Sequence, residues 1–204
     1  MRIQHAALLT IAFAPAITLG ACGRVKYPTY YTLHLPAPPD PPPALEARAS
    51  LAVREFRSPA YLRQGPVVYR PSPEQIGFYN YYRWAADPRQ TVTTAIIDRL
   101  RAGGNFAEVV AYDGRSNVDY MLSGRLEKLQ EVDYEGGVKV EVEVSAQLTS
   151  LRTGATVWAN SASDIENVAQ RNVPAVVGEM STVMDHAIGK LLSSMPAYQL
   201  QPNR

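Results

Sequence analysis

The sequence holds a single cysteine, Cys22, and its surroundings suit the attachment of a lipid. Leu19-Gly20-Ala21-Cys22 closes a 14-residue, mostly apolar run that begins at Ala6. That run is shorter than the roughly 20 apolar residues of a membrane-spanning helix, and a small residue precedes the cysteine, as in a lipoprotein signal peptide. We therefore expect cleavage before Cys22 and lipidation of its thiol. Residues 1–21 would be the signal peptide and 22–29 the lipidated tether.

An ordinary secretory signal is the alternative, because only Arg2 and His5 supply positive charge at the N-terminus. Cys22 would then be a free thiol, which is unusual in an exported protein. A lipid explains the cysteine, and two or more acyl chains hold a protein stably on a membrane. We therefore predict a protein that works tethered to a membrane through its lipid anchor.

Residues suited to catalysis or metal binding are few. Once the signal peptide is removed, two histidines remain, His34 and His186. His186 lies in a short polar cluster with Glu179, Asp185 and Lys190. This cluster could serve as a base or a metal site in an envelope hydrolase, or it could be a solvated helix face. No Gly-x-Ser-x-Gly, His-Glu-x-x-His or phosphate-loop spacing accompanies it. We expect no catalytic residues, no metal and no cofactor.

Length and charge indicate one domain with a packed core. Without residues 1–21, 183 of the 204 residues remain, and their 19 basic and 19 acidic side chains balance. This balance argues against a nucleic-acid partner, which would require a basic surface. Because a single cysteine forms no intramolecular disulfide, the stability of the fold must come from burial of apolar side chains. The domain is expected over 30–195, with a flexible tail at 196–204.

Hydrophobic patterning predicts an α+β domain with a mixed, largely antiparallel sheet and two main helices packed on it. Asp87-Pro88 is typical of a helix start and Gly103-Gly104 of a helix end. A second helix, from about Pro174 to Met195, carries a wide apolar stripe that would cover the sheet or, alternatively, line a membrane surface or lipid groove. Strands are predicted over 30–35, 45–56, 67–70, 77–84, 107–112, 118–134, 138–149 and 155–165. The prolines at 36–43 would form a spacer or a ligand for an aromatic groove.

The strand over 77–84 is rich in aromatic residues. Alternation divides its side chains into two sets, with Phe78, Tyr82 and Trp84 on one face and Tyr79, Tyr81 and Arg83 on the other. One set would build the core, while the second would meet a partner or another subunit, or would also be buried within the monomer. Arg83 could bind an anionic headgroup, pair with a carboxylate or cover an aromatic ring.

Several short blocks resemble the ABC-type transport auxiliary lipoprotein family, of which paraquat-inducible protein C is a member. The blocks are Tyr30-Tyr31-Thr32-Leu33, Pro59-Ala60-Tyr61-Leu62, Val67-Val68-Tyr69-Arg70 and Tyr82-Arg83-Trp84-Ala85. The resemblance extends over about 27–195. It implies a non-catalytic periplasmic lipoprotein that accompanies a mammalian-cell-entry (MCE) domain protein with its ABC permease and ATPase. Such systems move phospholipids or other hydrophobic molecules between the inner and outer membranes.

The resemblance further implies docking of the MCE subunit at the outer membrane and self-association into a ring. Gly23 after the lipidated cysteine, in place of aspartate, resembles lipoproteins released to the outer membrane. The surface expected to meet a partner or another subunit comprises Pro59, Tyr61, Leu62, Tyr79, Tyr81, Arg83 and Trp84. Two other functions remain open: a lipid-binding carrier with cargo between the sheet and the last helix, and an envelope hydrolase that uses His186.

Overall fold

The computed structural model describes residues 25–40, 49–115, 117–134 and 136–196. The predicted signal peptide, Cys22, prolines 41–43 and the tail after residue 196 lie outside the described residues. The structure therefore describes only residues 25–29 of the expected tether.

The chain forms an eight-stranded mixed sheet and two helices, which confirms the predicted α+β class. The elements are β1 (Thr29–Tyr31), β2 (Ser50–Val53), the 3-10 helix η1 (Ala60–Arg63), β3 (Pro66–Ser72), β4 (Gln75–Trp84), α1 (Pro88–Ala102), β5 (Glu108–Ala111), β6 (Tyr120–Val132), β7 (Lys139–Ser150), β8 (Thr156–Asn167) and α2 (Val173–Ser193). The first two strands are shorter than predicted. β1 ends at Tyr31, five residues before Pro36, and the His34 N–H after it donates to the Ser181 hydroxyl on α2 instead of to a neighbouring strand.

Strand β6 is the centre of the sheet. It pairs along its length with β7, and β7 pairs with β8, in the two longest ladders of the sheet, both antiparallel. On its other side β6 has two parallel neighbours, β2 beside Tyr120–Leu122 and β3 beside Glu131–Val132. Between these two contacts, the connection from β2 to β3 meets β6 through the bridge of Arg57 with Arg125 and through the Tyr61 hydroxyl, which donates to the Glu127 carbonyl.

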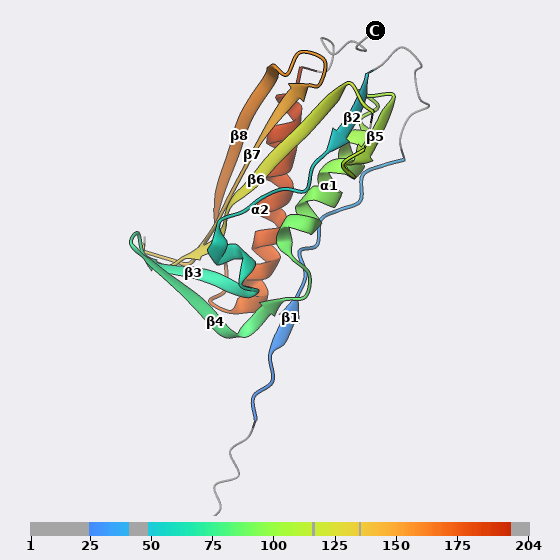
Figure 1. Ribbon diagram of the computed structural model, residues 1–204. Coiled ribbons are helices and arrows are strands. Elements are labelled where there is room, and N and C mark those ends of the chain that lie inside the picture. Colours follow the sequence, from blue (N-terminus) through green and yellow to red (C-terminus); the bar gives the residue numbers. More distant parts are fainter. Residues whose placement is uncertain (1–24, 41–48, 116, 135, 197–204) are drawn as a thin grey trace, which may run out of the picture.

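Both helices lie on one face of the sheet, and the other face is open (Figure 1). The predicted alternation in β7 is confirmed, since Val140, Val142 and Val144 are buried and lie under α2. The apolar stripe of α2 faces the sheet, so the core interpretation of this helix holds. Its fully buried side chains are Met180, Val183, Met184, Ala187, Ile188 and Leu191. In the described part of the chain, neither helix has the length and apolar character of a bilayer span.

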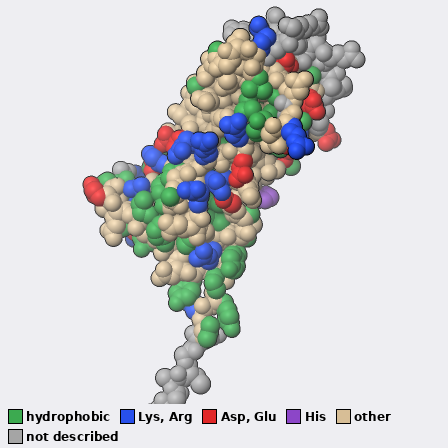
Figure 2. Space-filling model, in the orientation of Figure 1, with side chains coloured by type: hydrophobic (Ala, Val, Ile, Leu, Met, Phe, Trp, Pro, Cys, Tyr) green, Lys and Arg blue, Asp and Glu red, His purple; other side chains and the backbone are tan. Residues whose placement is uncertain are grey.

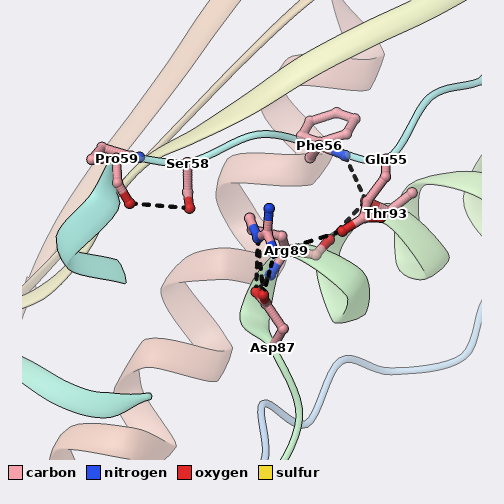
Figure 3. Close-up of polar contacts among 7 residues, drawn as sticks. All are labelled: Glu55, Phe56, Ser58, Pro59, Asp87, Arg89 and Thr93. Carbon is pink, nitrogen blue, oxygen red and sulfur yellow. Dashed lines mark hydrogen bonds and ion pairs between the residues drawn. The ribbon is translucent and has the colours of Figure 1, made fainter. Parts of the chain in front are cut away.

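The start of α1 is also as predicted, with Asp87 as its N-cap and Pro88 at the first helical position. Figure 3 shows the contacts at this end. The Asp87 carboxylate accepts a hydrogen bond from the Arg89 backbone N–H at 2.9 Å. Thr93 Oγ1 accepts one from the Phe56 N–H at 3.0 Å, which attaches the connection between β2 and β3 to the helix. Glu55 lies 3.8 Å from Arg89 Nη2.

Replacing Asp87 with alanine is expected to reduce stability by about 1 kcal/mol at neutral pH, the usual cost of a lost N-cap. Burial opposes ionisation of Asp87, but hydrogen bonds from Arg89 outweigh it and lower the pKa. The folded state therefore favours the charged carboxylate, and this stabilisation is lost as the pH falls through the folded-state pKa. Thermal melts at pH 7 and pH 3 test this, with Asp98→Ala in the middle of the helix as control. An equal loss at both pH values would contradict the prediction.

Candidate functional site

The predicted surface was drawn from two sequence blocks, 59–62 and 79–84, and the structure places them next to each other and next to β1. Strand β1 lies parallel to β4, with Tyr30 in register with Arg83. The Trp84 N–H donates to the Gly65 carbonyl at 2.8 Å, and Arg83 Nη2 donates to the Gln64 carbonyl at 3.0 Å. Gly65 has a φ of +96°, a conformation that favours glycine, and a Cβ there would lie 2.8 Å from Arg83 Nη2. Arg83 thus anchors the turn between η1 and β3.

Several of the seven predicted surface residues are buried or hydrogen-bonded within the protein. Leu62 and Trp84 are only 3% and 7% exposed, so their side chains belong to the core rather than to a surface. Tyr61 is half-buried and donates from its hydroxyl to the Glu127 carbonyl at 3.2 Å. The Pro59 carbonyl accepts the Leu62 N–H at 3.2 Å, which closes η1. Tyr81, at 40%, is the predicted aromatic residue that stays exposed.

The predicted alternation along β4 is wrong at Tyr79. Alternation would separate Tyr79 from Tyr82, yet their rings are in contact, with centroids 5.7 Å apart and planes at 74°. The physical reason is a register shift against β3, where the three residues from Pro66 to Val68 oppose the six from Phe78 to Arg83. Extra residues in one strand locally reverse the direction of side chains.

A row of tyrosines results from this shift. Tyr31, Tyr82, Tyr79 and Tyr69 follow one another, with ring centroids 6.1, 5.7 and 4.9 Å apart. The Tyr79 hydroxyl donates to Glu131 Oε2 at 2.8 Å. Burial raises the pKa of both groups, and the Glu131 carboxylate adds to the increase in the pKa of Tyr79. These contacts pack the four tyrosine rings together at the end of the sheet near β1.

Replacing Glu131 with glutamine is expected to stabilise the protein at pH 8 and to have little effect at pH 4. Burial raises the folded-state pKa of this carboxyl, so the protonated form is favoured, and stability is lost as the pH rises through that pKa. Glutamine is neutral and keeps an acceptor for the Tyr79 hydroxyl. Denaturant melts at both pH values measure the difference, with the exposed Glu166→Gln as control. A destabilised Glu131→Gln protein at pH 8 would refute this account.

An exposed apolar patch lies beside the row of tyrosines, where the described chain begins. It consists of Val25, Tyr27, Tyr30 and Tyr81, whose side chains are 40–78% exposed, and we call it the aromatic tip. Lys26 Nζ lies 4.5 Å from the centroid of the Tyr81 ring, so the first segment contacts β4. Figure 2 shows hydrophobic side chains gathered at this end of the molecule, next to the grey trace. The sequence prediction included Tyr81 but missed Tyr27 and Tyr30, although aromatic residues next to a tether are a readable signal.

Comparison with known proteins identifies the family. The profile of the ABC-type transport auxiliary lipoprotein component matches residues 31–190. The chain belongs to this family. The resemblance inferred from the short sequence blocks is therefore confirmed, and the match covers β2 to β8, α1 and most of α2. No curated protein matches the sequence of this auxiliary lipoprotein.

Solved structures show the same fold. A protein from Xanthomonas campestris is 17% identical, with 84% of this chain and 97% of that chain covered and a TM-score of 0.71. An uncharacterized protein is 18% identical, with 82% and 97% covered and a TM-score of 0.61. A PelC dodecamer from Paraburkholderia phytofirmans is 24% identical, with 74% and 91% covered and a TM-score of 0.47. At these identities the first two similarities show the fold alone.

Three of the four side chains of the polar cluster on α2, Asp185, His186 and Lys190, lie next to charged partners. His186 Nδ1 lies 3.8 Å and Lys190 Nζ 3.0 Å from Asp164 Oδ2 on β8. Asp185 pairs instead with Arg99 on α1. Within the described ranges, no group of three or more His, Cys, Asp or Glu side chains is arranged to hold a metal ion. His186 thus lies beside a carboxylate that Lys190 also contacts.

Two hollows lie outside the contact between α2 and the sheet. The larger, about 590 Å³, opens on the sheet face without helices. The smaller, about 310 Å³, lies between α2 and the segment after β1, next to His34 and Ser181. The Ser181 hydroxyl accepts from the His34 N–H at 3.1 Å and donates to the Val177 carbonyl, so it joins the two segments. The space that a carrier would use beneath α2 is filled by buried side chains.

Proposed function

We propose that this protein is the lipid-anchored accessory subunit of an MCE-type ABC transport system, which moves phospholipid or other hydrophobic molecules between the inner and outer membranes. It acts without catalysis, by docking and positioning the MCE subunit. Cys22 holds it at the periplasmic face of the outer membrane. Family membership supports the auxiliary role, and the exposed aromatic tip is the observation that supports docking.

The aromatic tip has the properties of a docking surface. Tyrosine supplies a large contact area with little side-chain entropy to lose, and it is enriched at protein interfaces. Tyr30 and Arg83 are register partners in parallel strands, so they share a face with Tyr81 two residues before Arg83. Tyr30 and Tyr81 lie on two paired strands, so their backbone is ordered before binding, which lowers the cost of docking. Either the MCE subunit or another copy of the chain in a ring would cover this surface.

Affinity purification of the tagged, full-length protein from detergent-solubilised envelopes tests the proposal. We expect mass spectrometry to identify an MCE-domain protein together with permease and ATPase subunits. The double variant Tyr30→Ser and Tyr81→Ser should reduce their recovery at least tenfold. Tyr134→Ser removes another exposed tyrosine far from the tip in sequence and should leave recovery unchanged.

Arg83 is a poorer test position than Tyr81, because its guanidinium also holds the Gln64 carbonyl. If replacing Arg83 abolished binding, the loss could result either from a missing contact with the partner or from a disturbed turn near Gln64. Recovery of the transport subunits with the double tyrosine variant at wild-type level would exclude the tip as the docking surface. Recovery of the lipoprotein with bound lipid and no protein partner would exclude the accessory role and favour a carrier.

A further inference from the structure

The open face of the sheet contains a cleft that the proposed docking role does not use. It measures about 590 Å³ and lies where the connection from β2 to β3 leaves the middle of β6. Its lining residues are Arg54, Glu55, Arg57, Ser123, Gly124, Arg125, Ser145, Ala146, Gln147, Ala159, Asn160 and Ser161. Figure 2 looks onto this face and shows Lys and Arg side chains gathered across its middle. We call this hollow the outer-face cleft.

Strand register places basic and hydroxyl side chains in one row across the cleft. Arg57 bridges Arg125 in parallel, Arg125 is opposite Ser145, and Ser145 is opposite Ser161. Register partners point to the same face of a sheet, and neighbouring strands are about 4.8 Å apart. The row therefore spans about 14 Å, from two guanidinium groups to two hydroxyls. Small side chains on β7 and β8 leave the space above it open.

Hydrogen bonding leaves the two arginines available to a ligand. Arg125 donates through Nε to both carboxylate oxygens of Glu127, each at 3.1 Å. Ser145 donates to the same carboxylate at 2.9 Å, which holds Glu127 in place. No hydrogen bond within the described residues engages the terminal nitrogens of Arg125 or the guanidinium of Arg57. Arg125 is thus oriented by Nε while its terminal fork remains free.

The balance of charge in the cleft favours an anion. Three lining arginines face two carboxylates: Glu55, which lies 3.8 Å from Arg89, and Glu127, which pairs with Arg125 at 3.1 Å. Arg54 covers the Tyr112 ring, with its Cζ 4.9 Å from the centroid, and it forms no salt bridge with another described residue. Two like charges in register on neighbouring strands destabilise a sheet. The Glu127 carboxylate offsets part of this repulsion at Arg125, and an anion bound between Arg57 and the terminal nitrogens of Arg125 would offset the rest.

We propose that the outer-face cleft binds a phosphate ester. Guanidinium forks match the geometry of phosphate oxygens, which suits Arg57 and Arg125 to the charged group. The hydroxyls of Ser123 and Ser161 and the Gln147 amide would bind the polar part of the ester, such as a glycerol. The volume is within the range of small-ligand sites. The ligand is either a phospholipid headgroup or a soluble phosphate ester, and this assignment does not depend on the proposed docking role.

Calorimetric titration of the full-length protein in nonionic detergent tests the site with two probes. Glycerol 3-phosphate represents a soluble ester, and dihexanoyl phosphatidylglycerol represents a lipid headgroup. We expect saturable binding of at least one probe. Binding of the lipid alone assigns a headgroup, whereas binding of glycerol 3-phosphate alone assigns a soluble ester. Binding of neither probe overturns the proposal.

Variants locate the binding in the cleft. Arg57→Gln and Arg125→Gln should each weaken binding at least tenfold, whereas Arg171→Gln, which removes the same charge from a site outside the cleft lining, should not. Ser161→Leu fills the cleft from an exposed position on the edge strand β8 and should block binding while thermal stability is retained. Unchanged affinity in Arg57→Gln and Ser161→Leu would overturn the site. Because no transport subunit is present, either result is independent of the affinity purification.

Discussion

Replacing Gly124 with alanine is expected to destabilise the protein by about 3 kcal/mol or more. A Cβ at this position in β6 would lie 2.3 Å from two atoms of the Phe56 ring and 2.7 Å from the Ser145 carbonyl oxygen. Phe56 is almost fully buried, and the Ser145 carbonyl belongs to the neighbouring strand β7. Because neither group can move without disturbing the core or the sheet, the added methyl group must displace structure.

Thermal unfolding measures the effect of Gly124→Ala. A loss of about 3 kcal/mol corresponds to a decrease in Tm of about 6–12 °C for a chain of this size. Gly189→Ala in α2 is the matched control, since its Cβ would have nothing within 4 Å, and alanine favours a helix by about 0.5–1 kcal/mol. Adding Phe56→Leu to Gly124→Ala should restore part of the stability, because only the ring contact is relieved. A Tm of Gly124→Ala within 2 °C of wild type would refute this account.

Elements that depend on local sequence were predictable. The strand over 139–150 alternates strictly, so its buried face could be assigned from the sequence alone. The start of α1 follows from Asp87-Pro88, because the cap uses side chains within three residues. The apolar stripe of α2 has helical spacing over its whole length, and the structure buries it against β7 and β8.

Features that depend on pairing between distant segments were not predictable. The register shift between β3 and β4 brings Tyr79 and Tyr82 into contact, and no local sequence pattern predicts this shift. Burial of Leu62 and Trp84 results from contacts with other elements, whereas their sequence blocks suggested a surface. Arg57 and Arg125 lie far apart in the sequence and become neighbours only because the connection between β2 and β3 bridges β6. The residues of the candidate surface are therefore neighbours in the structure, but Leu62 and Trp84 are buried, and contact of the others with a partner stays a prediction.

Replacing Cys22 with serine is expected to remove the protein from the membrane fraction almost completely. Serine lacks the thiol that would carry the lipid, and acyl chains each contribute about 0.8 kcal/mol per buried methylene to membrane binding. Flotation of membranes in a density gradient, together with labelling by a clickable palmitate analogue, measures the anchor. Gly23→Ala keeps the cysteine and serves as control. Equal flotation of both variants would favour an ordinary secretory signal.

The Cys22→Ser protein also separates anchoring from docking. Two residues, Gly23 and Arg24, lie between Cys22 and Val25, a reach of about 10 Å, so a lipid on the cysteine would keep the aromatic tip close to the membrane surface. Anchoring confines the tip to a thin layer and raises its effective concentration toward a membrane-bound partner. We expect recovery of the MCE subunit with Cys22→Ser to fall at native expression and to return at high expression. Loss of recovery at every expression level would mean that the lipid itself forms part of the docking surface.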